Sequence, residues 1–171
     1  KIEGSGKFLL GLINDILDIS KIESGKLVLN PTVFTKDDFE ESIDTTIRPL
    51  MKEKNMEFRC DIDCGVECIY ADRVRLEQIF FNLLSNAVKY TMPGGKIEFT
   101  AQKKEMPTED TWIRYRVSDN GIGMSPEFLK KALEPFEQEQ NGADLQWQGT
   151  GLGLTIVDKL VQIMGGVLQI E

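Results

Sequence analysis

The sequence predicts an α+β fold: a two-layer α/β sandwich in which helices cover a mixed, mostly antiparallel sheet. Two observations lead to this class. Several stretches repeat apolar residues at every third or fourth position, as amphipathic helices do, and shorter stretches alternate with the period of a strand. Most predicted strands follow one another through turns, which favours α+β over a parallel α/β arrangement. The 171 residues, 41% hydrophobic and 28% charged, suit a globular domain.

The first predicted element is an N-terminal amphipathic helix over residues 1–23, which precedes the sandwich. Its apolar residues are dense enough to make more than one contact, and Gly25 supplies a stop signal. The helix packs either on its own domain or on a partner helix in a dimeric stalk. Its apolar positions are Phe8, Leu9, Leu12, Ile13, Ile16, Leu17, Ile19 and Ile22.

A strand over residues 26–29 and a helix capped by Thr35 come next. Pro49 lies inside this helix pattern and is a candidate for a kink. The apolar face of the helix consists of Phe39, Ile43, Ile47 and Leu50.

Short strands are expected over residues 56–62 and 67–70, around a turn at Gly65. Asp72 is placed to cap a strongly periodic helix over residues 73–90. The apolar stripe of that helix is formed by Leu76, Phe80, Leu83 and Ala87.

The second half of the chain alternates between strands, turns and helices in a regular order. The expected elements are strands over 96–103 and 112–118 joined by a polar turn at 104–110, a glycine-rich turn at 119–124, a short helix after Ser125, a polar stretch without clear period at 134–150, a helix from near Thr150 to Gly165 and Gly166, and a last strand over 167–170.

The charge balance limits the partners of the chain. A formal net charge of −8 argues against an extended nucleic-acid or anionic-membrane surface, so any phosphate must be bound by a local site. No apolar run approaches the roughly 20 residues of a transmembrane helix, and the start does not resemble a signal peptide. We therefore expect a cytoplasmic location.

Three cysteines, Cys60, Cys64 and Cys68, are spaced four apart in a chain without histidine. Zinc pairs are commonly spaced more closely and converge with other ligands, so buried or idle thiols are favoured over a metal site. Cys60 belongs to an alternating pattern and is expected to face inward on a strand.

A line of polar residues runs along the helix 73–90 beside its apolar stripe. Asn82, Asn86 and Lys89 are spaced by four and three positions, which places them on one face. Two amides and an ammonium on a largely buried helix need partners, so they are candidates for binding a polar ligand. A solvated polar face would explain the same pattern.

Two glycine-rich runs are candidates for phosphate binding. The run 119–124 follows a strand, and the run 149–154 opens a helix, whose first backbone N–H groups suit an anion. Neither is a Walker loop, because no Lys-Ser or Lys-Thr follows, and neither lies in the βαβ unit of a dinucleotide fingerprint. Taken singly, each run fits a packing role of its glycines equally well.

Taken together and in this order, these segments resemble the nucleotide-binding boxes of sensor histidine kinases. Residues 82–91 are similar to the N box, 119–124 to the G1 box, 135–138 to the F box and 149–154 to the G2 box. Residues 12–27 resemble the second helix of the family's dimerisation stalk where it enters the catalytic domain. The resemblance therefore runs through the whole chain.

The resemblance implies two domains and a familiar fold. Residues 1–25 would be the second stalk helix, and residues 26–171 the catalytic ATP-binding domain, with the sandwich shared by gyrase-type ATPases and heat-shock chaperones. The chain has no histidine, so the acceptor helix would lie outside it. It ends where the family usually continues into closing strands, so we expect these strands to be missing.

The resemblance also implies a site for ATP and Mg²⁺. Asn86, with Asn82 beside it, would hold the magnesium ion, which prefers oxygen ligands. Lys89 would reach a phosphate, Tyr90 would pack near the nucleoside, and Asp119 would accept a hydrogen bond from the adenine amino group. The other implied binding residues are Gly121 and Gly123 beside the base, Gly151 and Gly153 at the phosphates, and Met124, Gly149, Thr150, Leu152 and Leu154 around them.

The implied reaction is transfer of the γ-phosphoryl group to a histidine nitrogen, with Asn82 and Lys89 as catalytic residues. Hydrolytic relatives carry a glutamate at the position of Asn82, and an amide cannot act as a general base, so a kinase is favoured over an ATPase. Residues 134–150 would form the ATP lid, with Phe136 as its apolar contact. This lid has no Lys or Arg, which leaves open a nucleotide-binding signalling module with little or no transfer activity.

The implied partners are ATP, the stalk histidine of its own dimer and, indirectly, the receiver domain of a response regulator, with no nucleic acid. The parent protein is expected to be a homodimer and an inner-membrane sensor of a two-component system.

Overall fold

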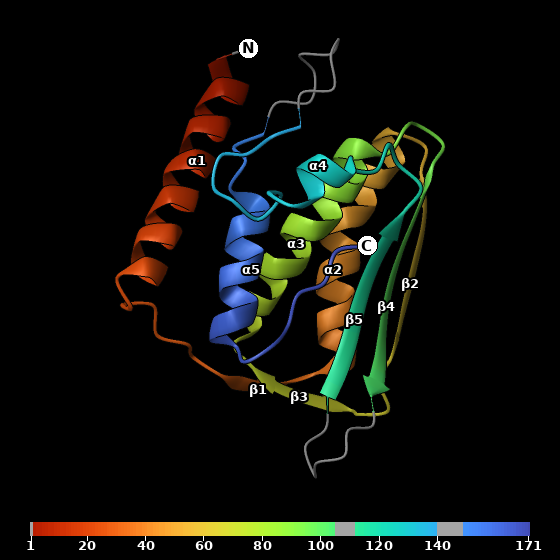
Figure 1. Ribbon diagram of the computed structural model, residues 1–171. Helices are drawn as coiled ribbons and strands as arrows, with labels where there is room; N and C mark the ends of the chain where they lie inside the picture. The colour runs from red at the N-terminus through yellow and green to blue at the C-terminus, as the bar shows by residue number, and fades with distance from the viewer. Residues whose placement is uncertain (1, 105–111, 140–148) are drawn as a thin grey trace. The chain divides into compact units, whose positions relative to one another are not determined.

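A three-stranded mixed sheet with two helices on one face is the central feature of the computed structural model (Figure 1). The structure describes residues 2–104, 112–139 and 149–171. The chain divides into two units, which we call the sheet unit (residues 30–123) and the helical unit (residues 1–29 and 124–171).

The elements of both units confirm the predicted α+β class. In chain order they are α1 (Ile2–Glu23), β1 (Thr32–Thr35), α2 (Lys36–Glu53), β2 (Glu57–Asp63), β3 (Cys68–Ala71), α3 (Arg73–Tyr90), β4 (Lys96–Lys104), β5 (Trp112–Asp119), α4 (Pro126–Leu129) and α5 (Gly153–Ile163). The sheet has the order β2-β4-β5, with β2 parallel to β4 and β4 antiparallel to β5. Strands β1 and β3 form a separate antiparallel pair.

An aromatic cluster joins α2 and α3 to the sheet. The Phe80 ring on α3 lies 4.8 Å from Phe99 on β4 and 4.8 Å from Tyr115 on β5, measured between ring centroids. Phe39 on α2 lies 5.7 Å from Phe80 in an edge-on arrangement. Such pairs add to the stabilisation from buried apolar area, so this cluster fixes α3 against the sheet.

Both predicted helix caps of the sheet unit are confirmed. The Thr35 hydroxyl accepts a hydrogen bond from the N–H of Asp38, at 3.0 Å. Asp72 is buried and uses both carboxylate oxygens, accepting from the N–H of Arg75 at 3.1 Å and from the N–H of Asn30 at 2.8 Å. The second bond ties the start of the sheet unit to the start of α3.

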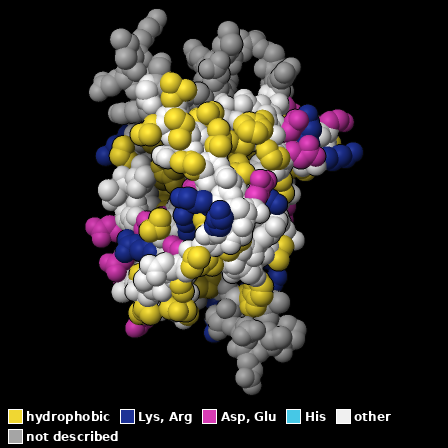
Figure 2. All heavy atoms as spheres, turned by 90° about the vertical axis from the view of Figure 1, so that its left-hand side faces the viewer, with side chains coloured by type: hydrophobic (Ala, Val, Ile, Leu, Met, Phe, Trp, Pro, Cys, Tyr) yellow, Lys and Arg dark blue, Asp and Glu magenta, His cyan; other side chains and the backbone are white. Residues whose placement is uncertain are grey.

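Helix α1 of the helical unit has an exposed apolar face. It is followed by Gly25, whose φ of +64° lies in the left-handed region that glycine favours. Figure 2 shows hydrophobic side chains gathered on the face turned toward the viewer. The exposed apolar residues of α1 are Leu9, Leu10, Ile13, Ile16 and Leu17. Within the described residues, no helix is long and apolar enough to cross a bilayer.

Two predicted strands are wrong, and one strand was missed. Residues 26–29 are not a strand, because the N–H groups of Lys26 and Leu27 turn back to the Lys21 carbonyl and close the end of α1. Residues 167–170 have strand-like alternation, but no described strand pairs with them. The missed strand is β1, which the structure places a few residues after the predicted one.

The strands predicted around Gly65 are confirmed, and the apolar stripe predicted for α3 needs adjustment. Strands β2 and β3 flank Gly65 as expected but belong to different sheets. The apolar stripe of α3 passes through the fully buried Leu84, whereas Leu83 is half-buried. Residues 105–110 of the predicted turn and residues 140–148 of the predicted lid lie outside the described residues.

The cysteines behave as separate thiols. Cys60 is half-buried on the inward face of β2, as predicted, while Cys64 is buried and Cys68 is exposed. Burial, with a smaller contribution from nearby carboxylates, raises the pKa of Cys60 to about 12. Across the described residues, no group of three or more His, Cys, Asp or Glu side chains is placed to hold a metal ion.

Cysteine reactivity tests this arrangement. The thiolate is the reactive form, so at pH 8 the Cys60 thiol stays protonated, four pH units below its pKa of about 12. We expect iodoacetamide to alkylate the exposed Cys68 more than about tenfold faster than Cys60, by peptide mass spectrometry. Equal rates would contradict the burial of Cys60.

Adjacent phenylalanines on α3 test the aromatic cluster. Phe80 is 4% exposed and Phe81 is 44% exposed. We expect Phe80→Ala to lower the free energy of unfolding by about 3–5 kcal/mol, because it removes the central ring of the cluster. The matched Phe81→Ala variant should cost much less. Urea unfolding followed by circular dichroism measures both, and equal losses would contradict the packing described here.

Candidate functional site

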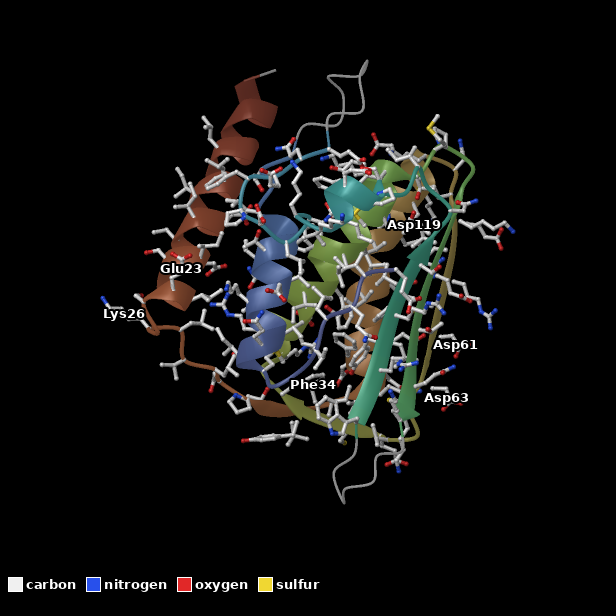
Figure 3. All side chains as sticks on the ribbon, in the orientation of Figure 1. Glu23, Lys26, Phe34, Asp61, Asp63 and Asp119 are labelled. Atoms are coloured by element: carbon white, nitrogen blue, oxygen red, sulfur yellow. The ribbon has the colours of Figure 1, made fainter. Side chains whose placement is uncertain are left out.

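The end of α3 contacts the glycine-rich loop that follows β5. The Tyr90 carbonyl accepts a hydrogen bond from the N–H of Ile122, at 3.2 Å. Asp119, at the end of β5 (Figure 3), accepts from the N–H of Gly121 at 2.9 Å and from the hydroxyl of the fully buried Thr91 at 3.5 Å. These bonds hold the loop against the helix end.

Gly121 is the residue that permits this close approach. A Cβ atom there would lie 2.5 Å from the Tyr90 carbonyl oxygen and 2.8 Å from Asp119 Oδ1. The neighbouring Gly123 is required for another reason, since its φ is +69° while a Cβ would meet no atom within 4 Å. The two glycines of the run therefore serve close contact and backbone conformation respectively.

The Asp119 carboxylate retains an unused oxygen. Both of its hydrogen bonds within the described residues involve Oδ1, and the side chain is exposed. The second oxygen can therefore accept a hydrogen bond from the amino group of a ligand, in an orientation that Gly121 and Thr91 fix.

The polar line on α3, formed by Asn82, Asn86 and Lys89, is half-buried. Within the described part of the chain, the side-chain amides of Asn82 and Asn86 make no hydrogen bond. Lys89 Nζ donates to the Tyr90 hydroxyl at 2.9 Å and lies 4.6 Å from that ring's centroid. Amide oxygens are suitable Mg²⁺ ligands, and the ammonium suits a phosphate.

In the helical unit, the run 149–154 leads into α5. Gly151 has a φ of +72°, and a Cβ there would lie 2.7 Å from the carbonyl carbon of Phe136. The Phe136 N–H donates to the Gly151 carbonyl at 3.0 Å, and the Gln138 side chain donates to the Gly149 carbonyl at 2.7 Å. The start of the predicted lid is therefore held against this turn, with the Phe136 side chain exposed.

Thr150 connects this turn to α1. Its hydroxyl donates to Asp15 Oδ2 at 3.2 Å and accepts from the N–H of Leu152 at 3.2 Å. Burial raises the pKa of Asp15, the bond from Thr150 opposes this, and the charge of Asp18 adds to the increase. No side chain caps α5 at Leu152 among the described residues, so the first N–H groups of the helix are suited to an anion.

The predicted residues thus form two groups, one in each unit. The first is connected by hydrogen bonds through Lys89, Tyr90, Asp119 and Gly121, with Asn82 and Asn86 on the preceding turns of α3 and Gly123 in the loop. The second contains Phe136, Gly149, Thr150, Gly151 and Leu152, with Gly153 and Leu154 in the first turn of α5. Met124, at the start of the second segment of the helical unit, makes no hydrogen bond to either group within the described residues.

The sequence did not single out Thr91 or Lys54. Thr91 is polar yet fully buried and donates to Asp119. The Lys54 ammonium donates hydrogen bonds to carbonyls at the end of α3. Thr91 lies in the segment 82–91 but outside the polar line of α3, and only the tertiary structure brings Lys54 to the end of this helix.

Comparison with known proteins places this geometry in a family. Residues 71–171, more than half of the chain, match the family described as histidine kinase-, DNA gyrase B- and HSP90-like ATPase. Over 169 residues the chain is 38% identical to the autoinducer 2 sensor kinase/phosphatase LuxQ of Vibrio vulnificus, covering 98% of this chain and 20% of LuxQ. The chain thus spans about a fifth of that relative's length.

Solved structures agree with this assignment. Full-length ShkA in complex with AMPPNP has a TM-score of 0.79 at 30% identity, covering 95% of this chain and 32% of ShkA. The histidine kinase ThkA in complex with the response regulator TrrA has a TM-score of 0.70 at 26% identity, covering 96% of this chain and 43% of ThkA. The chain therefore belongs to the histidine kinase-, DNA gyrase B- and HSP90-like ATPase family, with the sensor histidine kinases as its similar relatives.

Proposed function

We propose that this chain binds ATP with Mg²⁺ and acts as the catalytic domain of a sensor histidine kinase, transferring the γ-phosphoryl group to a stalk histidine. The observation that carries the proposal is the exposed Asp119 carboxylate, fixed by Thr91 and Gly121 beside the end of α3. The similarity to ShkA, whose structure contains an ATP analogue, supports it.

Recognition of the base rests on Asp119. Its unused oxygen would accept a hydrogen bond from the adenine amino group, whereas guanine presents a carbonyl at the corresponding position and would be repelled. Because Gly121 lacks a side chain, the backbone can come close to the ring.

Each unit has groups that suit a phosphate. Lys89 would contribute a point charge, and the glycine-rich turn before α5 would contribute backbone N–H groups. Asn86 fits Mg²⁺, since its half-buried amide makes no hydrogen bond within the described residues, and the ion would supply charge neutralisation at the phosphates. Asn82, an amide, would position this region without abstracting a proton.

Helix α1 supports a role in a dimeric stalk. Its exposed leucines and isoleucines would pack against stalk helices, and the acceptor histidine would come from the parent protein, because this sequence contains none. We propose a parent homodimer, divided at about residue 25 into stalk helix and catalytic domain, that passes its phosphoryl group to a receiver domain. The ThkA–TrrA complex supports such a partner.

A second candidate function is a nucleotide-binding signalling module with little transfer activity. The favouring observation is that residues 134–150 contain no Lys or Arg to contact the phosphates. Incubating the chain with radiolabelled ATP and a separately expressed stalk that carries the histidine distinguishes the two. Labelled stalk supports the kinase, and nucleotide binding without labelling supports the module.

Nucleotide selectivity tests the role of Asp119. In Asp119→Asn the side-chain oxygen can still accept a hydrogen bond from the Gly121 N–H. The side-chain NH₂ group, a donor, then faces the adenine amino group, which is also a donor. We expect the preference for AMPPNP over GMPPNP to fall by roughly ten- to a hundredfold, the effect of a charge-assisted hydrogen bond. Isothermal titration calorimetry with and without Mg²⁺ measures this, and undiminished selectivity would exclude Asp119 from base recognition.

The two glycines of the loop provide a matched pair. Gly121→Ala should weaken AMPPNP binding strongly, because the new Cβ must displace the Tyr90 carbonyl or Asp119. Gly123→Ala meets no atom and should mainly lower the free energy of unfolding by about 1 kcal/mol, the strain of a left-handed alanine. Calorimetry measures the AMPPNP affinity of both variants, and urea unfolding measures their stability. Equal AMPPNP affinities of the two variants would contradict the close contact assigned to Gly121.

A further inference from the structure

The end of α3 has an unusual set of hydrogen-bond donors. The last four carbonyls of a helix have no partner within the helix. Here the Ala87 carbonyl accepts from Thr91 N–H at 3.0 Å and the Tyr90 carbonyl accepts from Ile122 N–H at 3.2 Å. The carbonyls between them, of Val88 and Lys89, both accept from the ammonium of Lys54, at 2.6 and 3.2 Å.

Lys54 reaches this helix end from a distant part of the chain. It is the C-cap of α2, 34 positions before Val88, and its ammonium also lies 3.5 Å from the Thr91 carbonyl. Its own carbonyl accepts a hydrogen bond from the N–H of Gly94, at 3.0 Å. One residue therefore contacts both the last turn of α3 and the segment that follows it.

The charge of Lys54 suits this position. The C-terminal end of a helix carries a partial negative charge, which a cation stabilises. Bonds from an ammonium to carbonyl oxygens are also shorter and stronger than neutral ones. The last turn of α3 is thus held more firmly than the backbone alone would hold it.

We propose that Lys54 is a positioning residue for the nucleotide site, an inference that rests on the proposed function. The turn that it holds carries Lys89 and Tyr90, and the Tyr90 carbonyl in turn holds the 119–122 loop through Ile122. Thr91, whose carbonyl faces the Lys54 ammonium, bonds to Asp119 through its hydroxyl. Without the ammonium, the last turn of α3 frays and the Asp119 carboxylate loses its fixed orientation toward the base.

Base selectivity separates positioning from a merely structural role. If a variant only increased the unfolded fraction, the apparent affinities for ADP and GDP would fall by the same factor and their ratio would not change. Altered placement of Asp119 weakens ADP binding more than GDP binding, so the ratio falls.

The test compares Lys54→Met with Lys52→Met. Methionine keeps much of the aliphatic length and loses the ammonium. Lys52 is an exposed lysine on the same helix end, and its side chain makes no hydrogen bond or ion pair within the described residues. We expect the ratio of ADP to GDP affinity, from calorimetry, to fall roughly fivefold in Lys54→Met, a modest hydrogen-bond effect. Lys52→Met should match the wild type.

Lys54→Arg is the second variant if Lys54→Met does not fold. Arginine keeps the charge, but its planar guanidinium cannot bring one nitrogen to three converging carbonyls. The ratio of ADP to GDP affinity should therefore also fall in this variant, by a smaller factor. Suppose that the wild type prefers ADP and that every folded Lys54 variant keeps the wild-type ratio of ADP to GDP affinity. That result would overturn the positioning role of Lys54 and leave the proposed function standing. A folded wild type that binds neither nucleotide would instead remove the proposed function and this inference with it.

Discussion

The hydrogen bond from the N–H of Ile122 to the carbonyl of Tyr90 is the contact on which the sheet-unit site depends. It joins the end of a helix to the loop after a strand, and it requires Gly121 because a side chain there would strike the same carbonyl. The aromatic cluster around Phe80 fixes α3 on the sheet, so the carbonyl has a defined position. Asp119 then acquires its orientation from bonds to Gly121 and Thr91.

The proposed binding residues lie in two groups, one in each unit. The residues around Asp119 are held by hydrogen bonds and close packing within one unit. The turn before α5 is connected instead to α1, through Thr150 and Asp15, and to the first residues of the predicted lid, through Phe136. Helix α1 therefore bonds directly to a turn whose N–H groups suit a phosphate.

Local signals made much of the fold predictable from sequence. Thr35 and Asp72 cap their helices through their own side chains. The residue type at one position was therefore enough to predict where each helix begins. Strands were less predictable because they need a partner: residues 26–29 have a strand-like composition, yet their N–H groups close α1, and pairing with β3 selects residues 32–35 instead. Lys54 gave no signal because its role depends on carbonyls 34 positions away.

The proposed site residues stood out in the sequence chiefly as an ordered set of motifs. Neither glycine run was decisive alone, and each has a structural reason in the fold: contact at Gly121, left-handed backbone at Gly123 and Gly151. The polar line of α3 needed the structure to show that the amides of Asn82 and Asn86 are half-buried without hydrogen bonds among the described residues. Such groups are available to a ligand, which the sequence pattern could suggest but not establish.

An NMR titration with AMPPNP tests the central claim most directly, because it reports where the nucleotide binds. We expect the backbone amide signals of Gly121 and Ile122 to move on addition of AMPPNP. We also expect the side-chain amide signal of Asn86 to move further when Mg²⁺ is added. Shifts confined to other parts of the sheet unit, or spectra unchanged at saturating nucleotide, would contradict an ATP site at the end of α3.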